Sequence, residues 1–351
     1  MAYTTIDKPS KYFNTVLWTG NGGTQTITGV GFQPSLVWGK SRSVNYEQSW
    51  IDFIRGGTKY LFSNGVSAES TDANAITSFN SDGFSIGSSP YIGNANGATY
   101  VGWNWLASNS TVSNTSGTLT STVSNNPTAG FSILTYTGNG SSGATVGHGL
   151  GTTPACYIVK CRNTGGTNWS MYHQSLGNTK AMVFTATAAR TSSAYWNNTS
   201  PTSTVFSLGN DVDPNGSGYT YVAYCFAQIK GYSKFGSYIG NASSTSGPFI
   251  YTGFKPAFVI IKSSTVTGIS RWMMKDNKRN TYNIVANNLQ IDTNSIENTD
   301  ANDYADFLSN GFRITATSTS ANTNNSGETY IYLAFAENPF VTSGGIPVTA
   351  R

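Results

Sequence analysis

The sequence predicts an all-β protein built from three tandem antiparallel β-sandwich repeats of the jelly-roll type. Three observations support this. Short segments alternate apolar and polar residues, and a group of motifs recurs three times in the same order. The third is composition: 13% of the 351 residues are aromatic and only 10% are charged, against about 25% charged in ordinary soluble domains. The aromatic content indicates a folded chain, with hydroxyl, amide and glycine groups at its surface.

The most distinctive repeated element is a strand that closes each copy. It follows a small-residue turn, begins Thr-Tyr and continues with apolar residues on both faces, in segments 99–107, 220–227 and 329–336. β-Branched and aromatic residues in a period of two are typical of strands. Because both faces are fairly apolar, we expect a central strand that is covered on both sides.

Further motifs precede this strand in each copy. One strand runs from a proline to a lysine, over Pro34–Lys40, Pro154–Lys160 and Pro256–Lys262. Upstream of it, an aromatic residue leads to a Gly-Asn pair, in Trp18–Asn21, Tyr136–Asn139 and Tyr238–Asn241. A tryptophan follows each lysine, as Trp50, Trp169 and Trp272. The constant order of these motifs predicts a three-domain tandem array.

The repeats set the expected domain organisation. The segments are an N-terminal arm 1–12, repeat 1 at 13–107, a Ser/Thr/Asn linker 108–129, repeat 2 at 130–228, repeat 3 at 235–340 and a C-terminal tail 341–351. The linker has no charged or aromatic residue, so we expect a flexible or irregular extended segment. Because the second junction is short, repeats 2 and 3 are expected to pack together. The arm is expected to dock on a partner's sheet edge, and a short helix is expected at 300–310.

Composition and local patterns exclude several classes of protein. The longest apolar runs, such as 258–261, are of strand length, so no membrane insertion is expected. The first residues lack the apolar region of a secretory signal. Cys156, Cys161 and Cys225 are expected to be buried thiols without a disulfide framework. A net charge of +4 is too weak to indicate a nucleic-acid partner.

No catalytic constellation is visible in the sequence. The two histidines, His148 and His173, both lie in repeat 2 and are expected to be polar surface or turn residues. The nucleophile-elbow, zinc-helix, phosphate-loop and dinucleotide motifs are absent from the sequence. We therefore expect no enzyme and no cofactor. A glycosidase carboxylate pair stays open as an alternative, because sequence spacing says little about proximity across a sandwich.

Two weak candidate sites remain. Asp211, Asp213 and Asn215 begin like a calcium loop, but Val222 stands where a bidentate glutamate is needed. The other reading of this segment is a polar hairpin loop. Repeat 3 carries a basic cluster that is a candidate for contacts with a partner or neighbouring subunit, the alternative being a solvated surface. The members of this cluster are Arg271, Lys275, Lys278 and Arg279.

The repeat motifs carry a family resemblance. The segments MAYTTIDKPSKYFNTVLWTGNG, GYSKFGSYIGN, YTGFKPAFVIIK, DFLSNGFRI and TYIYLAFAENPF resemble a β-rich repeat family of uncharacterised virion and tail-associated proteins of marine tailed bacteriophages. The resemblance covers nearly the whole chain outside 108–129 and 342–351. It transfers no catalytic or ligand residue.

The resemblance implies a bacteriophage virion structural protein assembled in the host bacterial cytoplasm. The function it implies most directly is that of a tail fibre or appendage for host-surface attachment. A capsid decoration or head-fibre protein is the alternative, and a glycan depolymerase is a third. The implied partners are other virion proteins, further copies of this chain in a homo-oligomer such as a trimer, and a host cell-surface glycan.

Overall fold

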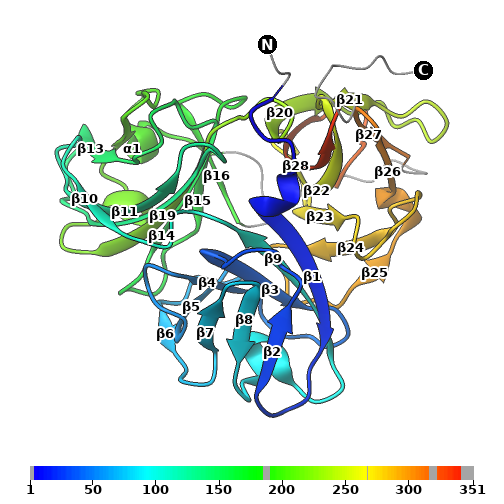
Figure 1. The fold of residues 1–351 in the computed structure, drawn as a ribbon. Coiled ribbons are helices and arrows are strands. Elements are labelled where there is room, and N and C mark those ends of the chain that lie inside the picture. The colour runs from blue at the N-terminus through cyan, green and yellow to red at the C-terminus, as the bar shows by residue number, and fades with distance from the viewer. Residues whose placement is uncertain (1–3, 185–189, 267, 316–321, 341–351) are drawn as a thin grey trace.

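The computed structural model describes residues 4–184, 190–266, 268–315 and 322–340, and the predicted all-β antiparallel fold class is confirmed. Figure 1 shows three β-rich lobes, which we number in chain order: lobe 1 is coloured blue to cyan, lobe 2 green, and lobe 3 yellow to red. Helical structure in the described ranges is limited to short turns. These are η1 (Pro9–Lys11), η2 (Pro90–Asn94), α1 (Ser193–Trp196), α2 (Val212–Asn215) and η3 (Ala301–Asp303).

Each lobe contains one large sheet, and the strand order of that sheet recurs from lobe to lobe. The first sheet has the order β1 (Phe13–Thr19), β9 (Thr99–Trp105), β3 (Leu36–Ser41), β4 (Ser49–Asp52), β5 (Lys59–Phe62), β6 (Ser70–Thr71). The second has β10 (Val112–Asn114), β11 (Ser121–Asn126), β12 (Phe131–Thr137), β19 (Thr220–Phe226), β14 (Cys156–Cys161), β15 (Ser170–His173), β16 (Lys180–Val183), β17 (Arg190–Thr191). The third has β20 (Ser233–Ile239), β28 (Thr329–Pro339), β22 (Phe254–Ser263), β23 (Met273–Asp276), β24 (Asn287–Gln290), β25 (Asn298–Thr299).

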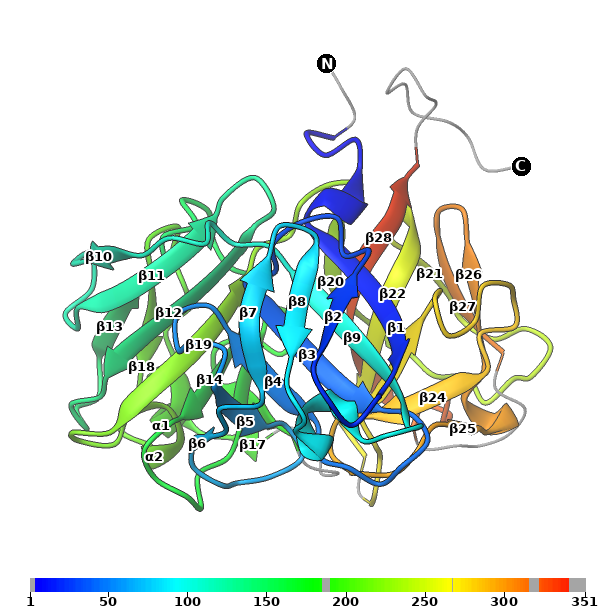
Figure 2. The ribbon, with the colours of Figure 1, turned by 60° about the horizontal axis from the view of Figure 1, so that its bottom comes forward.

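A smaller sheet packs on one face of each large sheet and completes a sandwich. These sheets are β2 (Gln25–Thr28), β8 (Gly83–Ile86), β7 (Ile76–Asn80); β13 (Ala144–Gly147), β18 (Val205–Leu208); and β21 (Phe249–Tyr251), β27 (Gly311–Ile314), β26 (Ala305–Leu308). Each sandwich has its own apolar cluster, in which Phe84, Phe206 and Phe312 are buried. Figure 2 shows β2, β7 and β8 in front of the first large sheet.

The opposite faces of the three large sheets meet in one shared cluster, which we call the axial core. Its side chains come from all three lobes. They include Trp38, Trp50, Trp103, Trp105, Phe131, Trp169, Phe226, Phe258, Trp272 and Phe335. The closing strands therefore serve two cores: in β9, Trp103 lies in the axial core, while Tyr100 on the opposite face of the strand packs on Trp18 in the first sandwich. This double burial explains why both faces of these strands are apolar.

The aromatic-to-asparagine motif fixes one end of each sandwich. Trp18 stacks on Tyr100 with ring centroids 5.5 Å apart. A Cβ at Gly20 would lie 2.2 Å from the carbonyl oxygen of Ala95, so only glycine fits there. The backbone N–H of Asn21 donates to the side chain of Asn94. The matching pairs in the other lobes are Tyr136 with Tyr221, Asn139 with Asn215, Tyr238 with Tyr330, and Asn241 with Asn324.

The three lobes form a closed head-to-tail ring. Strand register gives the equivalent positions, because Lys40, Lys160 and Lys262 lie opposite Val101, Val222 and Ile331. At one equivalent position, a side-chain N–H of each lobe donates to the last residue of β24, β5 or β16 in the next lobe. The donor–acceptor pairs are Gln48 Nε2 with Gln290 O, Trp169 Nε1 with Phe62 O, and Trp272 Nε1 with Val183 O. A repeated heterologous contact that returns to its start makes a closed ring.

The register corrects the alignment of the three tryptophans. Trp50 lies opposite Trp38, and the same position holds Met171 and Met274 in the other lobes. Trp169 and Trp272 precede their strands and correspond to Gln48. The loops 42–48, 162–169 and 264–272 differ in length, so counting residues from the lysine does not find equivalent positions.

The linker and the expected helix are also corrected. Segment 108–129 contains β10 and β11, and β11 pairs with β12 at the edge of the second sheet. An uncharged Ser/Thr/Asn segment satisfies its backbone there by joining a sheet, even though its composition is that of a linker. At 300–310 only the short turn η3 forms before β26, because Phe307 and its neighbours pair with β27.

The N-terminal arm is not a docking strand over its described part. Ile6 is buried in the axial core, and η1 contacts β28. Burial of the apolar Ile6 side chain in this chain's own core is more favourable in free energy than its exposure to water. Residues 1–3 of the arm and the whole C-terminal tail 341–351 lie outside the described residues.

A buried ion pair marks the seam between lobes 1 and 2. Asp52 and Arg55 are 2.5 Å apart with fully buried side chains, and the hydroxyl of Tyr224 from lobe 2 donates to Asp52. At the seam between lobes 3 and 1, Asp276 and Arg279 form the same pair, and Trp103 Nε1 donates to Asp276. Lobe 2 carries His173 at the aspartate position, with Leu176 three residues on.

We expect Asp52→Asn to lower the free energy of unfolding by about 2–3 kcal/mol, because the buried Arg55 would lose its nearest counter-charge and keep only the ion pair to Glu69 at 3.1 Å. The double variant Asp52→His with Arg55→Leu reproduces the lobe 2 pair and should recover at least half of that loss. Urea unfolding followed by tryptophan fluorescence measures both. Equal destabilisation by the single and double variants would contradict the role of the charge balance between Asp52 and Arg55.

Candidate functional site

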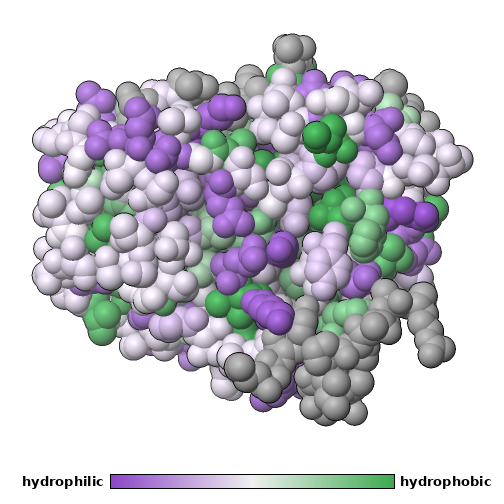
Figure 3. All heavy atoms as spheres, turned by 90° about the horizontal axis from the view of Figure 1, so that it is seen from above, coloured by the Kyte–Doolittle hydropathy of each residue, from purple (hydrophilic) through white to green (hydrophobic). Residues whose placement is uncertain are grey.

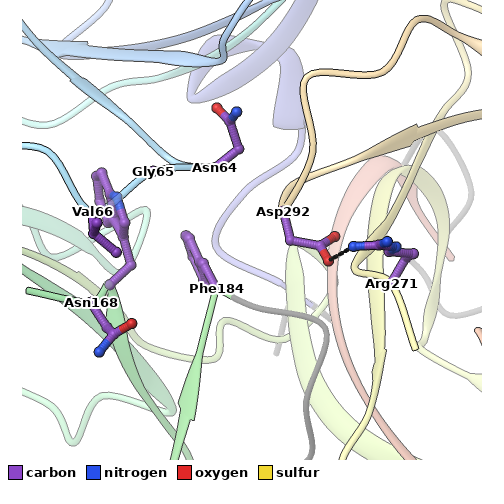
Figure 4. Close-up of a pocket in the computed structure, with 8 residues that line it drawn as sticks. Asn64, Gly65, Val66, Asn168, Phe184, Arg271 and Asp292 are labelled. Atoms are coloured by element: carbon purple, nitrogen blue, oxygen red, sulfur yellow. Dashed lines mark hydrogen bonds and ion pairs between the residues drawn. The ribbon is translucent and has the colours of Figure 1, made fainter. Parts of the chain in front are cut away.

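A pocket opens where the three lobes meet, and we call it the axial pocket. Its volume is about 190 Å³. Lobe 1 supplies the loop after β5, lobe 2 the residues flanking β15 and β16, and lobe 3 the residues flanking β23 and β24 (Figure 4). The lining residues are Asn64, Gly65, Val66, Asn168, Trp169, Phe184, Arg271 and Asp292.

Polar side chains form the rim at equivalent positions. In lobe 3, Arg271 pairs with Asp292 at 3.2 Å, and the N–H of Trp272 donates to the same carboxylate. In lobe 1, the N–H of Gln48 donates to Asn64 in the same way, and Asn64 contacts Glu47. The same two backbone positions therefore carry an ion pair in one lobe and an amide–carboxylate pair in another.

The floor of the pocket is aromatic. Phe184 stacks on Trp169 with ring centroids 5.6 Å apart and an interplanar angle of 12°. It also contacts Trp272 at 5.1 Å and Trp50 at 6.4 Å. One phenyl ring thus touches a tryptophan from each of the three lobes, and it joins the pocket to the axial core.

Three buried lysines donate hydrogen bonds to the carbonyl groups of loops. Lys160 Nζ donates to Thr167 O at 2.6 Å and reaches Val66 O of lobe 1 at 3.3 Å. Lys40 likewise donates to its own lobe and to Asn294 O of lobe 3, at 2.8 Å each. Lys262 donates to Ser270 O at 2.6 Å. These lysines cap loop carbonyl groups, and two of them tie one lobe to the next.

Burial shifts the pKa of these lysines downward. Desolvation of the ammonium group lowers the pKa of Lys40, Lys160 and Lys262 from 10.5 to about 8. Lys275, which is wholly buried against Val285 O and Asn288, has a pKa lowered by desolvation to about 7. The fold therefore pays an electrostatic penalty wherever these groups are charged.

The rim and floor together suit a small polar ligand. Amide, carboxylate and guanidinium groups bond hydroxyls, and an aromatic floor provides an apolar face, as a sugar ring requires. The volume is below the roughly 300–1,000 Å³ of ordinary ligand pockets, so one ring is the largest group it suits. The lining residues include no pair of nucleophile and general base. In the described ranges, no group of three or more His, Cys, Asp and Glu side chains is placed to hold a metal ion.

The structure separates the basic cluster predicted in repeat 3. Lys275 and Arg279 are buried, and Arg279 is held by Asp276 and by Glu297. Arg271 is paired with Asp292 at the axial pocket. Only Lys278 of the four is exposed. Spacing in sequence placed the four together, but the strand and its following turn direct their side chains to a sandwich, a seam, the pocket and solvent.

The weak calcium candidate has other roles. The Asp211 side chain caps α2 by accepting from Asp213 N–H. The Asp213 carboxylate accepts from the backbone and side chain of Asn168, at 2.7 and 2.9 Å. Asn215 belongs to the asparagine pair that fixes the end of the second sandwich. The segment therefore serves as a hydrogen-bonding turn, which agrees with the hairpin-loop reading more than with a cation site.

Both histidines differ from the expectation of surface or turn residues, because both are fully buried. His148 contacts Thr202 O and accepts from Leu150 N–H. His173 contacts Tyr332 O across the seam between lobes 2 and 3, and desolvation lowers its pKa to about 4. They lie in separate environments. The three cysteines are buried and free, and burial raises the pKa of Cys156 and Cys225.

The pocket residues escaped sequence reasoning because no local motif marks them. Asn64 and Asp292 are two residues past a short strand, and Asn168 and Arg271 each precede a tryptophan. The only available signal was the tryptophan itself: Trp169 and Trp272 belong to a repeated motif, and their neighbours are natural candidates for a junction between repeats.

An all-β chain whose like-ordered sheets share one aromatic core is a β-repeat protein. The chain belongs to the DUF7483 family, described as a domain of unknown function, whose model matches residues 8–339. No curated protein and no solved structure matches the chain. Among the described residues, no helix has the length and apolar character needed to cross a bilayer.

We expect the free energy of unfolding to rise between pH 7 and pH 9. The unfolded state binds more protons than the folded state over this range, since each buried lysine loses its proton near pH 7 or 8 when folded and near 10.5 when unfolded. The gain is about 1 kcal/mol for each lysine. The rise in the free energy of unfolding ends above pH 9, because cysteine and then tyrosine side chains ionise in the unfolded chain. Urea unfolding at several pH values measures the rise, and Lys160→Met should reduce it by about 1 kcal/mol, the contribution of one lysine; an unchanged slope in that variant would contradict the assignment.

We expect Phe184→Ala to lower the free energy of unfolding by about 3–5 kcal/mol, because it leaves a cavity among three tryptophans. Phe184→Leu keeps most of the volume and should cost less than half as much. Intrinsic fluorescence should shift to the red in the alanine variant as water reaches the indoles. A loss below 1 kcal/mol with an unshifted spectrum would show that the ring does not join the lobes.

Proposed function

We propose that this chain is a structural protein of a tailed-bacteriophage particle, and that it serves as a tail fibre or related appendage contacting the host surface. The observation that supports the proposal most is the closed ring of three sandwiches around one aromatic core. Such a ring is a rigid body whose loops can be varied without touching the fold. The family resemblance of its motifs supplies the particle context.

The surface agrees with a role in contact rather than in catalysis. Figure 3 shows broad pale areas with small green and purple patches on one face, as a surface rich in Ser, Thr and Gly gives. Hydroxyl and amide groups bond sugar hydroxyls without the desolvation cost of ions. The axial pocket adds an aromatic floor with a polar rim. We infer that a host-surface glycan is the natural counterpart of this surface.

A capsid decoration or head-fibre protein is the second candidate. Its support is the arrangement of three similar lobes within one chain, which would match the three-fold environments of a capsid lattice. The same arrangement bears on oligomerisation. Because the chain closes its ring internally, further copies would associate through outer surfaces.

A glycan depolymerase has less support. The buried carboxylates of the described residues are already engaged by donors within the fold. These pairs are Asp52 with Arg55 and Tyr224, Asp213 with Asn168 and Tyr195, Asp276 with Arg279 and Trp103, Asp303 with Asn322 and Thr323, and Asp306 with Arg313. A retaining or inverting mechanism needs two carboxyl groups that face a cleft.

Immunogold labelling of purified virions against this chain tests the proposal. We expect gold at the tail or tail tip. Labelling on the capsid faces would favour the decoration candidate, and an absence of the chain from washed particles would contradict both. Release of reducing ends from host polysaccharide by the purified chain would instead support the depolymerase.

A further inference from the structure

Lobe 2 shows how an outer strand covers the open edge of a sandwich. In the second large sheet, β12 pairs with β11, and Thr135 lies opposite Thr122. The same outer strand reaches the smaller sheet, because Leu119 N–H donates to Thr145 O of β13 and Ser121 Oγ donates to Gly147 O. Segment 117–126 therefore closes both layers of this sandwich on one side.

Within the described residues, lobe 3 has the same two strands without this cover. Its large sheet ends at β20 and its smaller sheet ends at β21. By register, Ser237 corresponds to Thr135, and Phe249 and Tyr251 correspond to Thr145 and Gly147. The junction 228–234 is too short to supply a covering strand.

Backbone groups at these edges face outward. Gly240 N–H donates to Glu328 O, so alternation along an antiparallel pair directs the N–H and C=O groups of Ser237 and Ile239 away from β28. Thr252 N–H donates to Asn310 O, so the same alternation directs the backbone N–H and C=O groups of Phe249 and Tyr251 away from β27. Within the described residues, these four have no other backbone hydrogen-bond partner.

Large apolar side chains are exposed beside these edges. Ile239 is 64% exposed, Tyr251 54% and Phe249 49%. In lobe 2 the corresponding positions hold the small residues Thr137, Thr145 and Gly147, of which Thr137 lies beyond the end of β11 and stays exposed. An open double edge that also exposes apolar side chains is the kind of feature that proteins normally cover or blunt.

Lobe 1 shows the blunted version of this edge. The Asn14 side chain accepts from Thr15 N–H and donates to Gly29 O and Val30 O. Gln25 Nε2 donates to Thr19 O. By register, Thr15 and Thr19 correspond to Phe235 and Ile239. Lobe 3 caps Phe235 in a similar way through Gln228 and Gln174, but within the described residues no side-chain amide bonds the backbone of Ile239.

We propose that β20 and β21 form a docking site for an extended segment of another protein chain. The segment adds to β20 as an antiparallel strand and reaches the edge of β21, beside Phe249 and Tyr251. Its chemistry follows from the strand that fills the equivalent place in lobe 2: uncharged, with hydroxyl residues alternating with aliphatic ones, as in Thr118–Val123. This assignment stands independently of where the chain sits on a particle.

Register-specific disulfide trapping on the full chain tests the proposal. The probe is a synthetic peptide of residues 117–126 with Thr122→Cys. Directly opposed residues of an antiparallel pair lie close enough for a disulfide. The peptide should trap on Ser237→Cys at least about five times more than on Ile239→Cys, which is out of register. The native thiols are buried and should not compete.

Thr135→Cys is the matched control, because its edge is already covered by β11. We expect little trapping there. Equal trapping at Thr135→Cys and Ser237→Cys, or none at either, would overturn the docking site. Sedimentation of the unmodified chain tests the other occupant: a dimer that Ile239→Lys dissociates would show that a second copy covers this edge, and would overturn the assignment to another protein.

Discussion

The structure depends on the burial of both faces of three closing strands. β9, β19 and β28 each give one face to a sandwich and the other to the axial core, so none of the three large sheets is complete without the other two. Tryptophan and phenylalanine rings from all three lobes meet at this junction, and they pack edge to face across lobes. The seams, the axial pocket and the buried charges all follow from this shared core.

The scarcity of charge takes on a different meaning in the folded chain. Part of the small charged set lies at the seams: Arg55 and Arg279 are buried with aspartates, Arg42 and Arg162 pair with glutamates of the adjacent lobe, and lysines cap loop carbonyls. Such groups add little net stability but penalise wrong pairings. The seam between lobes 2 and 3 uses His173 in place of the aspartate. The three seams are therefore chemically distinct, which fixes the neighbours of each lobe.

The fold class and the recurring motifs could be predicted from sequence because they are local. Trp18, Gly20 and Asn21 belong to a repeated motif, and its copies make matching contacts in the three lobes. The segments predicted as closing strands are strands in the structure. Features set by tertiary contact could not be predicted. The charge-free segment 108–129 joins a sheet because β12 offers an edge, and Ile6 enters a core that also contains residues from the other end of the chain, such as Phe335. Arg271, Lys275, Lys278 and Arg279 separate because a strand and a tight turn point them in different directions. The axial pocket belongs to no single repeat, so no single repeat contains its pattern.

Closing the ring within one chain has a consequence for the order of assembly. The last seam joins Arg42 to Glu297 and Lys40 to Asn294, so it pairs residues from opposite ends of the polypeptide. During synthesis, lobe 1 must wait with its tryptophan-lined face uncovered until lobe 3 has emerged. Contacts of such long sequence separation form slowly, and a partly made chain presents an apolar surface meanwhile.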